Sequence, residues 1–312
     1  MITIPEMLAR NARMYPDDCA LVELKPSQDF RREITWKEFD DKANQVANAL
    51  LDMEVTKGDK VIHWMMNSID WLIVYFGILR SGAWVVPLNF RFTSQDLKYC
   101  ADISEASVMV IGEEFIERVD AVKQQLQHVR KYVAWGGELP GYMTKFSEMI
   151  QGYTAEQPGI AIRDEDSCSL YFTSGTTGAP KPILLTHNNL KCAAITENVH
   201  HHQQKEDNFI LIPPLYHAGS KMHWFGSLIV GGRATLINEV SPRNILEAVH
   251  KERGTIVWLL VPWAYDILVA LEKGRINQED YDLSCWRLMH IGAQPVPPSL
   301  VRQWKTIFPS MQ

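Results

Sequence analysis

Short apolar segments of strand type alternate with helix-length segments along most of this chain, and this alternation constrains the fold more than any other feature. Strand-like segments at 60–64, 84–87 and 108–111 are separated by helical segments at 69–79 and 93–102. Parallel strands need crossover connections of a dozen or more residues, usually a helix. The pattern therefore predicts right-handed βαβ units and an α/β fold with mainly parallel sheets covered on both faces. The second half repeats the pattern, with strand-like segments at 209–212, 234–237, 256–261 and 287–291.

Helix start signals support these assignments. Thr35 with Glu38 has the sequence of a capping box, Ser68 can cap the helix at 69–79, and Ser241 followed by Pro242 is typical of a helix start. Further helices are expected at 114–127, 188–200, 223–230 and 298–308.

The chain is long enough for two hydrophobic cores. Its 312 residues, of which 46% are hydrophobic, exceed the usual size of a single core. The strand and helix pattern weakens between residues 136 and 166, where glycine, proline and acidic residues gather. We therefore expect an N-terminal α/β subdomain at 1–165 and a second α/β subdomain at 166–312.

Composition limits the cellular setting and the partners. A net charge of −6 and a pI near 5.9 argue against a nucleic-acid surface, which needs clustered basic residues. Five scattered cysteines without a CxxC pair suit a reducing compartment and argue against structural zinc. The longest apolar run, 71–79, is far shorter than a membrane span, and the N-terminus does not resemble a signal peptide. We expect a soluble cytoplasmic protein with no integral membrane segment.

The segment 173–181, Thr-Ser-Gly-Thr-Thr-Gly-Ala-Pro-Lys, is poorly explained by folding needs alone. Two glycines let the backbone approach a ligand closely, while hydroxyls and one lysine suit a polyphosphate. The flanks predict strand, loop, strand and then helix. A Walker loop is excluded, because Ala179 and Pro180 separate Gly178 from Lys181. The alternative is an ordinary β-turn rich in small polar residues.

Three further features have ordinary structural explanations. His200, His201 and His202 are consecutive on a helix end and cannot all face one ion, so we expect them to face solvent and expect no protein metal ligands. Lys221 is expected at the surface. A lone histidine such as His217 is more often a packed or surface residue than a functional one.

Three motifs together resemble the AMP-forming acyl- and aryl-CoA synthetases, a superfamily that includes luciferases and peptide-synthetase adenylation domains. Residues 171–181, followed by Thr186-His187, are similar to the family's phosphate-loop signature. The segment 213–219, Pro-Pro-Leu-Tyr-His-Ala-Gly, is similar to its Pro-x-x-His-x-x-Gly segment, and 292–296, Gly-Ala-Gln-Pro-Val, to its adenine-binding Gly-Ala-x-Pro segment. Pro182 departs from the pattern, since the family usually has glycine there.

The resemblance implies two stacked αβαβα-type subdomains and a reaction of a small carboxylic acid with ATP to give an acyl-AMP and pyrophosphate, followed by a thioester with CoA. It implies ATP, Mg²⁺ and CoA as cofactors and a possible homodimer. Lys181, Thr176 and His217 would be catalytic. The nucleotide would contact Thr173, Ser174, Gly175, Thr176, Thr177, Gly178, Lys181, Gly292, Ala293 and Gln294.

The acyl pocket implied by the resemblance would include Tyr216, His217, Gly219, His223 and Trp258. If Trp224 and Trp258 both point inward, they restrict a deep tunnel and favour an aryl or a short-to-medium acyl acid. The alternative is that both tryptophans are core residues.

The family's later motifs are not present before Gln312, so we expect an N-terminal portion that lacks the small C-terminal domain and is inactive alone. Two other functions stay open. One is an acyl-AMP ligase that loads a carrier protein, and the other is a non-catalytic nucleotide-binding module.

Overall fold

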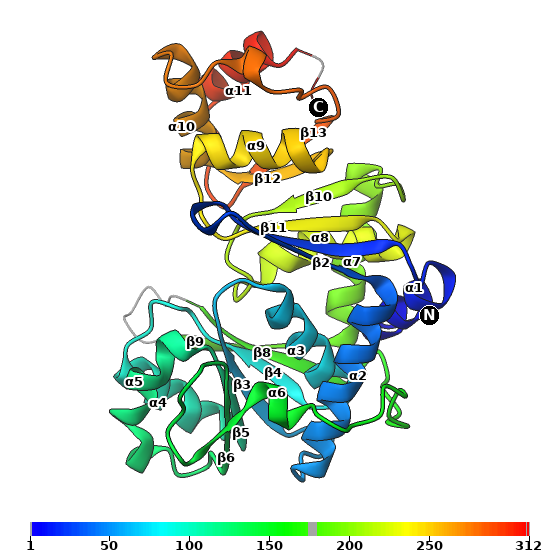
Figure 1. Cartoon of the computed structure of the whole chain (residues 1–312), viewed down its shortest axis with the longest axis vertical. Helices are drawn as coiled ribbons and strands as arrows, with labels where there is room; N and C mark the ends of the chain where they lie inside the picture. Colours follow the sequence, from blue (N-terminus) through cyan, green and yellow to red (C-terminus); the bar gives the residue numbers. More distant parts are fainter. Residues whose placement is uncertain (1, 174–179, 310, 312) are drawn as a thin grey trace.

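The computed structural model describes residues 2–173, 180–309 and 311, and it contains two β-sheets with helices between them and on both outer sides (Figure 1). The seven-stranded sheet has the order β7-β6-β5-β3-β4-β8-β9, and all its neighbours are parallel except β8 and β9. Its strands are β3 (Lys60–Trp64), β4 (Trp84–Pro87), β5 (Val108–Ile111), β6 (Lys131–Ala134), β7 (Met143–Lys145), β8 (Ser167–Thr173) and β9 (Lys181–Thr186).

The six-stranded sheet has the order β13-β12-β10-β11-β1-β2 and is parallel except for the β1–β2 hairpin. Its strands are β1 (Cys19–Lys25), β2 (Phe30–Thr35), β10 (Asn208–Leu211), β11 (Arg233–Ile237), β12 (Ile256–Leu260) and β13 (Leu288–Gly292). The predicted α/β class with mainly parallel sheets is confirmed.

A central helical layer lies between the two sheets, so the layers follow the predicted αβαβα order. One continuous core joins the inner faces of both sheets to this layer. Along β10 the side chains alternate as a pleated strand requires: Phe209 and Leu211 face the central core, and Ile210 faces the outer helices. The central helices are α1 (Ile4–Met14), α2 (Trp36–Asp52), α3 (Ile69–Arg80), α7 (His187–His201) and α8 (Ala218–Val230).

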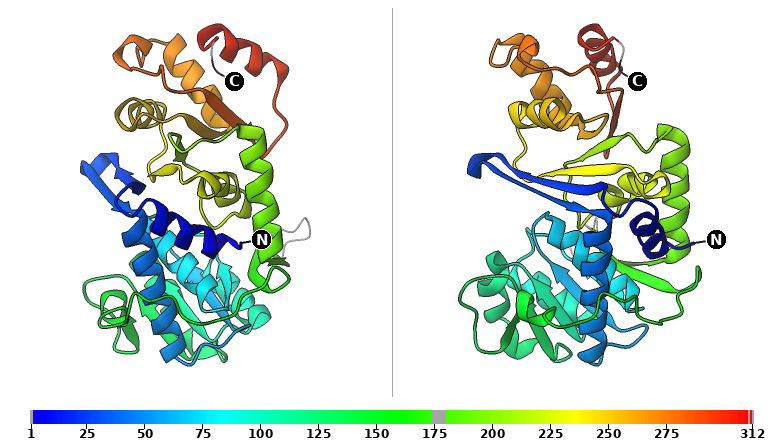
Figure 2. Two further views of the ribbon diagram at one scale, coloured as in Figure 1. Left: turned by 90° about the vertical axis from the view of Figure 1, so that its right-hand side faces the viewer. Right: turned by 45° about the vertical axis from the view of Figure 1, so that its right-hand side comes forward.

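Most of the remaining helices cover the outer faces. Those of the six-stranded sheet are α9 (Pro242–Glu252), α10 (Val261–Glu272) and α11 (Pro298–Ile307), and those of the seven-stranded sheet are α4 (Ser94–Ser104) and α5 (Ile116–Asp120). The short helix α6 (Phe146–Met149) packs its buried side chains into the central core. Figure 2 shows α10 and α11, in orange and red, at the end of the molecule farthest from the seven-stranded sheet. Within the described part of the chain, no helix combines the length and apolar character that a membrane crossing needs.

The predicted helix starts are confirmed. The Glu38 amide donates to Thr35 Oγ1 at 3.1 Å, and the Thr35 amide donates to Glu38 Oε2 at 2.8 Å. Ser68 Oγ accepts from the Trp71 amide at 3.0 Å, and Ser241 Oγ accepts from the Asn244 amide at 3.1 Å. Each cap satisfies an amide that has no partner inside its helix.

The helix expected at 114–127 is wrong as a continuous element. It is divided into a 3₁₀ turn at Glu113–Phe115, α5 and a second 3₁₀ turn at Lys123–Gln125. Val119, Asp120 and Val122 are weak helix formers, so packing against the seven-stranded sheet decides the local conformation. The structure also has β7 and α6 within 136–166, where the strand and helix pattern of the sequence weakens.

Neither sheet follows the expected division at residue 165. β1 and β2 come from the first half of the chain but belong to the six-stranded sheet, and β8 and β9 come from the second half but belong to the seven-stranded sheet. Whether 1–165 and 166–312 fold as separate units stays a prediction.

Candidate active site

The β8–β9 hairpin carries the two ends of the Thr- and Gly-rich segment. Thr173 and Lys181 are paired across the strands, as the predicted strand, loop and strand require. Ser174, Gly175, Thr176, Thr177 and Gly178 lie outside the described residues. Pro182 lies on β9 and pairs with Phe172 of β8. Because β9 is the edge strand of its sheet, the missing amide of proline is tolerated there.

Two neighbouring cavities share part of their walls, and one of them reaches this hairpin. The first has a volume of about 620 Å³, and its wall includes Gly219, His223, Trp258 and Ala293. The second has a volume of about 690 Å³ and reaches Thr173 at the end of β8. Four residues line both cavities and so mark their meeting point: Arg91, Tyr216, His217 and Gly219.

Tyr216 and His217 form this meeting point because the chain turns there into α8. Their rings are in contact in a tilted arrangement, with centroids 4.2 Å apart and 41° between the planes, and Tyr216 also packs edge-on against Phe90 at 5.4 Å. Partial desolvation, together with the positive charges of Lys221 and Arg91, lowers the pKa of His217 below its ordinary value. A neutral imidazole at pH 7 can accept or donate a hydrogen bond at this position.

The predicted adenine segment follows β13 at the edge of the first cavity. Gly292 is the last residue of β13, and Ala293 lines the cavity with a φ of +66°. Left-handed backbone is unfavourable for alanine by roughly 1–2 kcal/mol, and such positions cluster at binding sites. Gln294 is exposed and does not line either cavity.

Two pocket predictions from the sequence have different outcomes. Trp258 lines the first cavity and packs edge-on against His223 at 4.5 Å between ring centroids. Trp224 is fully buried in the central core and lines neither cavity. Only one of the two tryptophans therefore narrows the space.

Lys221 corrects the expectation of a surface position. It is fully buried in α8, and its Nζ donates to the carbonyl oxygens of Leu215 at 2.8 Å and His217 at 3.2 Å. The residue fixes the turn that carries His217. Burial lowers the pKa of Lys221 well below its ordinary value.

Sequence reasoning missed Arg91. It is the one lysine or arginine lining either cavity among the described residues, so it supplies their positive charge. Arg91 follows β4, and ligands in open parallel sheets gather beyond the carboxyl ends of strands. This rule, applied to the Asn89–Arg91 segment, could have found it.

His201 corrects the expectation that all three consecutive histidines face solvent. His200 and His202 are exposed, but His201 is buried and its Nε2 lies 2.7 Å from Nδ1 of His290 on β13. Glu197 on α7 and His223 on α8 complete a group that was not apparent from the sequence, because its members are distant along the chain. The pKa of His290 is lowered to about 4, mainly by burial and in smaller part by the charges of His223 and His201.

The described walls fit a nucleotide and an acid better than they fit a magnesium ion. Thr173 and Arg91 offer a hydroxyl and a positive charge. Neither cavity is lined by a carboxylate among the described residues. Mg²⁺ prefers oxygen ligands, commonly carboxylates and substrate phosphates. The described walls of the two cavities therefore supply no acidic ligand for it.

Known proteins with a similar sequence or fold include several acid–CoA ligases. A family model described as AMP-binding enzyme matches residues 8–312. The chain is 30% identical over 296 residues to the feruloyl-CoA synthase of Amycolatopsis sp, covering 95% of this chain and 55% of that protein. It is 24% identical over 301 residues to the medium-chain fatty-acid–CoA ligase of Escherichia coli (strain K12), covering 94% of this chain and 51% of that protein.

Among solved structures, the anthranilate CoA ligase AuaEII in complex with anthranoyl-AMP matches with a TM-score of 0.88 and 25% identity. The match covers 99% of this chain and 58% of that one. The chain spans about half the length of the curated relatives it matches.

Proposed function

This chain belongs to the AMP-binding enzyme family, and we propose that it provides the ATP- and acid-binding part of an AMP-forming acyl- or aryl-CoA ligase. The observation that carries the proposal is the meeting of two cavities at Tyr216 and His217. The second cavity is bordered by the residues before the Thr- and Gly-rich loop. The first cavity is an apolar space suited to an acyl or aryl group.

In the proposed reaction, an oxygen of the substrate carboxylate attacks the α-phosphorus of ATP. The bond from the α-phosphorus to the bridging oxygen breaks, pyrophosphate leaves, and an acyl-AMP forms. A thiol then displaces AMP to give the thioester. Ligases of this family use ATP, Mg²⁺ and CoA. Catalysis of this kind depends on positioning and on stabilising the charge that develops on phosphate oxygens.

Each predicted site residue has a role in this proposal. Thr173, Lys181 and the residues between them would hold the β- and γ-phosphates, with Thr176 and Lys181 closest to the developing charge. Gly292, Ala293 and Gln294 would hold the adenine. His217 would flank the carboxylate, and Arg91 would attract it electrostatically.

The first cavity favours an aromatic acid or a short-to-medium aliphatic acid. Its inner wall contains Trp258, Trp263 and Tyr216, whose flat rings suit stacking with an aryl group. Gly219 leaves the space in front of Trp258 open, since a Cβ at that position would lie 3.7 Å from Cη2 of Trp258.

The simplest test measures Mg·ATP binding by isothermal titration calorimetry to wild type and Lys181→Ala. We expect the variant to bind about 10-fold more weakly, because a charged hydrogen bond contributes about 1.5 kcal/mol or more. Binding of benzoyl-sulfamoyl-adenosine, which has no β- or γ-phosphate, should change little. The melting temperature should also change little.

Lys131→Ala is the matched control, because Lys131 is likewise an exposed lysine at the first residue of a strand. It should bind both ligands as wild type does. If the wild-type chain binds neither ligand, or if Lys181→Ala loses melting temperature in proportion to its affinity, the proposal is wrong.

The same preparation distinguishes the alternatives. We expect no pyrophosphate release from the 312-residue chain with ATP and a panel of benzoic and C4–C10 acids, because the chain spans only about half the length of the ligases it resembles. A carrier-protein ligase would transfer the acyl group to a phosphopantetheine protein and not to CoA. A non-catalytic module would bind ATP without binding the acyl-adenylate analogue. A cytoplasmic location and a homodimer are further predictions of the ligase proposal.

A further inference from the structure

Three histidines and one glutamate from three elements gather beside the first cavity, whose wall includes one of them, His223. We call Glu197 and His201 of α7, His223 of α8 and His290 of β13 the histidine cluster. Nδ1 of His223 lies 2.9 Å from Oε1 of Glu197, and Nδ1 of His290 lies 4.0 Å from Oε2. The atoms Glu197 Oε, His223 N and His290 N all lie within 4.8 Å of one another.

These spacings are close to those of a tetrahedral zinc site. Zn–N and Zn–O distances of about 2.0–2.1 Å place neighbouring ligand atoms roughly 3.3 Å apart. The separations of 2.9 Å and 4.0 Å from Glu197 lie on either side of that value, and the His223 and His290 nitrogens lie within 4.8 Å of each other, so small side-chain shifts would bring all three atoms around one ion. Imidazole and carboxylate are also the ligand types that divalent zinc accepts.

His223 faces the Glu197 carboxylate with a buried ring nitrogen. Its Nδ1 lies 2.9 Å from Oε1 of Glu197. Metal ligands must be deprotonated, and metal binding releases their protons. An ion bound between this nitrogen and the carboxylate would therefore take the place of a proton that the two groups now share.

The hydrogen bonds of His201 give it a different role from the other histidines. The Gln203 Nε2 group can only donate, and it lies 3.1 Å from Nδ1 of His201, so the His201 proton is on Nε2. That nitrogen lies 2.7 Å from Nδ1 of His290 and 3.3 Å from Oε2 of Glu197, so without an ion its proton is within reach of both. An ion bound to Nδ1 of His290 would leave the His201 proton to the carboxylate, which it would then orient, as partners of metal ligands commonly do.

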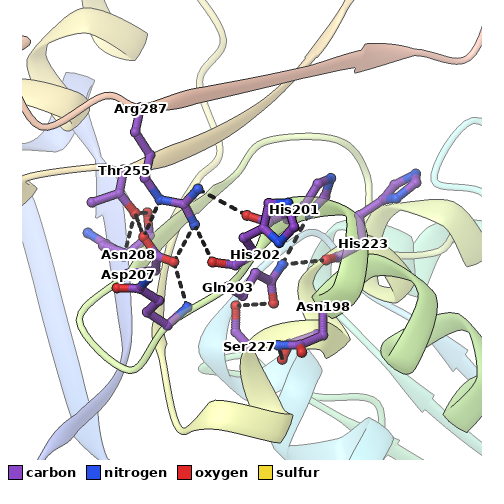
Figure 3. Close-up of polar contacts among 12 residues, drawn as sticks. Asn198, His201, His202, Gln203, Asp207, Asn208, His223, Ser227, Thr255 and Arg287 are labelled. Atoms are coloured by element: carbon purple, nitrogen blue, oxygen red, sulfur yellow. Dashed lines mark hydrogen bonds and ion pairs between the residues drawn. The ribbon is translucent and has the colours of Figure 1, made fainter. Parts of the chain in front are cut away.

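The surrounding structure holds the cluster in place. Figure 3 shows Gln203 between His201, the His223 backbone and Ser227, and Arg287 bound to Asp207 and to the backbone oxygens of His201 and His202. Arg287 precedes β13, which carries His290, and pairs with Asp207 through two contacts of 3.0 Å and 2.5 Å. This clamp fixes the end of α7 relative to β13.

We propose that Glu197, His223 and His290 bind a divalent transition metal ion, with Zn²⁺ as the best match, and that His201 positions the Glu197 carboxylate. Three protein ligands leave a fourth tetrahedral position for water or another donor. His223 lines the first cavity, so the ion would add positive charge next to its wall.

The test titrates Zn²⁺ alone into the chelator-treated chain, with a chromogenic chelator as competitor, and needs neither ATP nor an acid. We expect one bound ion per chain. His290→Gln should weaken binding at least 100-fold, since a ligand is lost, and His201→Ala about 10-fold to 100-fold, which is typical for a positioning partner. Because no substrate is used, this result is independent of the proposed ligase function.

His202→Gln is the matched control, because His202 adjoins His201 but is exposed. It should bind Zn²⁺ within twofold of wild type. Co²⁺ bound to wild type should show the visible bands of tetrahedral coordination, which tests the site even if a variant fails to fold. Absence of a stoichiometric ion in wild type, or equal losses in His290→Gln and His202→Gln, would overturn the proposal and leave a purely hydrogen-bonded cluster.

Discussion

Lys221 is a buried cation without a carboxylate partner among the described residues. Its Nζ is surrounded by the rings of Trp71, Tyr75 and Tyr171, with ring centroids 5.2, 5.1 and 4.7 Å away. Aromatic faces attract a cation but compensate poorly for lost hydration, which explains why the pKa of Lys221 is lowered.

Lys221 should make folding stability depend on pH in the alkaline range. Because the pKa of Lys221 is lowered in the folded state, the unfolded chain binds more protons between that value and 10.5. The free energy of unfolding should therefore rise with pH in this window, by up to about 1.4 kcal/mol per pH unit from this residue. Urea unfolding of wild type and Lys221→Met at pH 7, 8, 9 and 10 measures the difference in slope.

Lys221→Met is expected to remove this rise, since methionine keeps the volume and does not titrate. Its absolute stability at one pH is less informative, because the carbonyls of Leu215 and His217 lose their donor. If the free energy of unfolding changes with pH equally in the two proteins, Lys221 keeps an ordinary pKa.

Residue environments were the least predictable part of this protein. Motif positions such as Tyr216, His217 and Ala293 could be assigned to a cavity from the sequence, because they follow strand ends. Lys221 and His201 could not, because their neighbours are far away along the chain: His290 is 89 residues from His201. Burial of a polar side chain depends on such long-range contacts, which local patterns do not contain.

Elements were predicted best where flanking signals agreed with periodicity. β3, β4 and β5 begin and end at the predicted residues, because turn or cap residues delimit each apolar run. The helix expected at 114–127 failed where valines and an aspartate weaken local propensity. β7, with three residues, is too short to give a periodic signal.

The close packing of α2 on α3 depends on Gly77. A Cβ at Gly77 would lie 2.4 Å from Cγ1 of Val46 and 3.1 Å from the carbonyl oxygen of Ala43. The second contact involves backbone and cannot rotate away. We expect Gly77→Ala to destabilise the protein by about 1–3 kcal/mol, the usual cost of overpacking. Chemical denaturation measures this.

Gly219→Ala in α8 is the matched comparison, because its Cβ would make ordinary contacts of 3.7 and 3.8 Å. Alanine is the better helix former, so this variant should gain roughly 0.5–1 kcal/mol in stability while narrowing the first cavity. If both variants lose stability equally, helix packing at Gly77 is not the cause.

At the scale of the whole molecule, the layered α/β architecture was predictable, but the strand content of each sheet was not. Helix-length connections between apolar runs require parallel sheets, and the family motifs imply two of them. The β1–β2 hairpin lies beside β11, more than 190 residues later, and this pairing leaves no local trace in the sequence. The cavities between the sheets therefore depend on contacts between residues that are distant along the chain.

One such contact is made by Asn67, which connects the segment after β3 with the segment before α8. Its Nδ2 donates to the Pro213 carbonyl at 3.1 Å, and its Oδ1 accepts from the Leu215 amide at 2.8 Å. Asn67 also lines the first cavity. The side chain thus joins the two sheet regions at the cavity wall.

Asn67→Ala should lower the free energy of unfolding by about 1–3 kcal/mol, because two backbone groups lose their partner. It should also weaken binding of benzoyl-sulfamoyl-adenosine, since the Pro213–Leu215 segment leads directly to Tyr216 and His217. Asn48→Ala is the control: Asn48 is partly buried like Asn67 and also contacts two distant backbone groups, the carbonyls of Thr154 and Glu156, but it lines neither cavity. Urea unfolding and calorimetric titration should show that Asn48→Ala loses some stability and keeps its affinity. Equal affinity in the two variants would mean that the cavity is shaped within the segment before α8 and does not depend on this connection between the sheets.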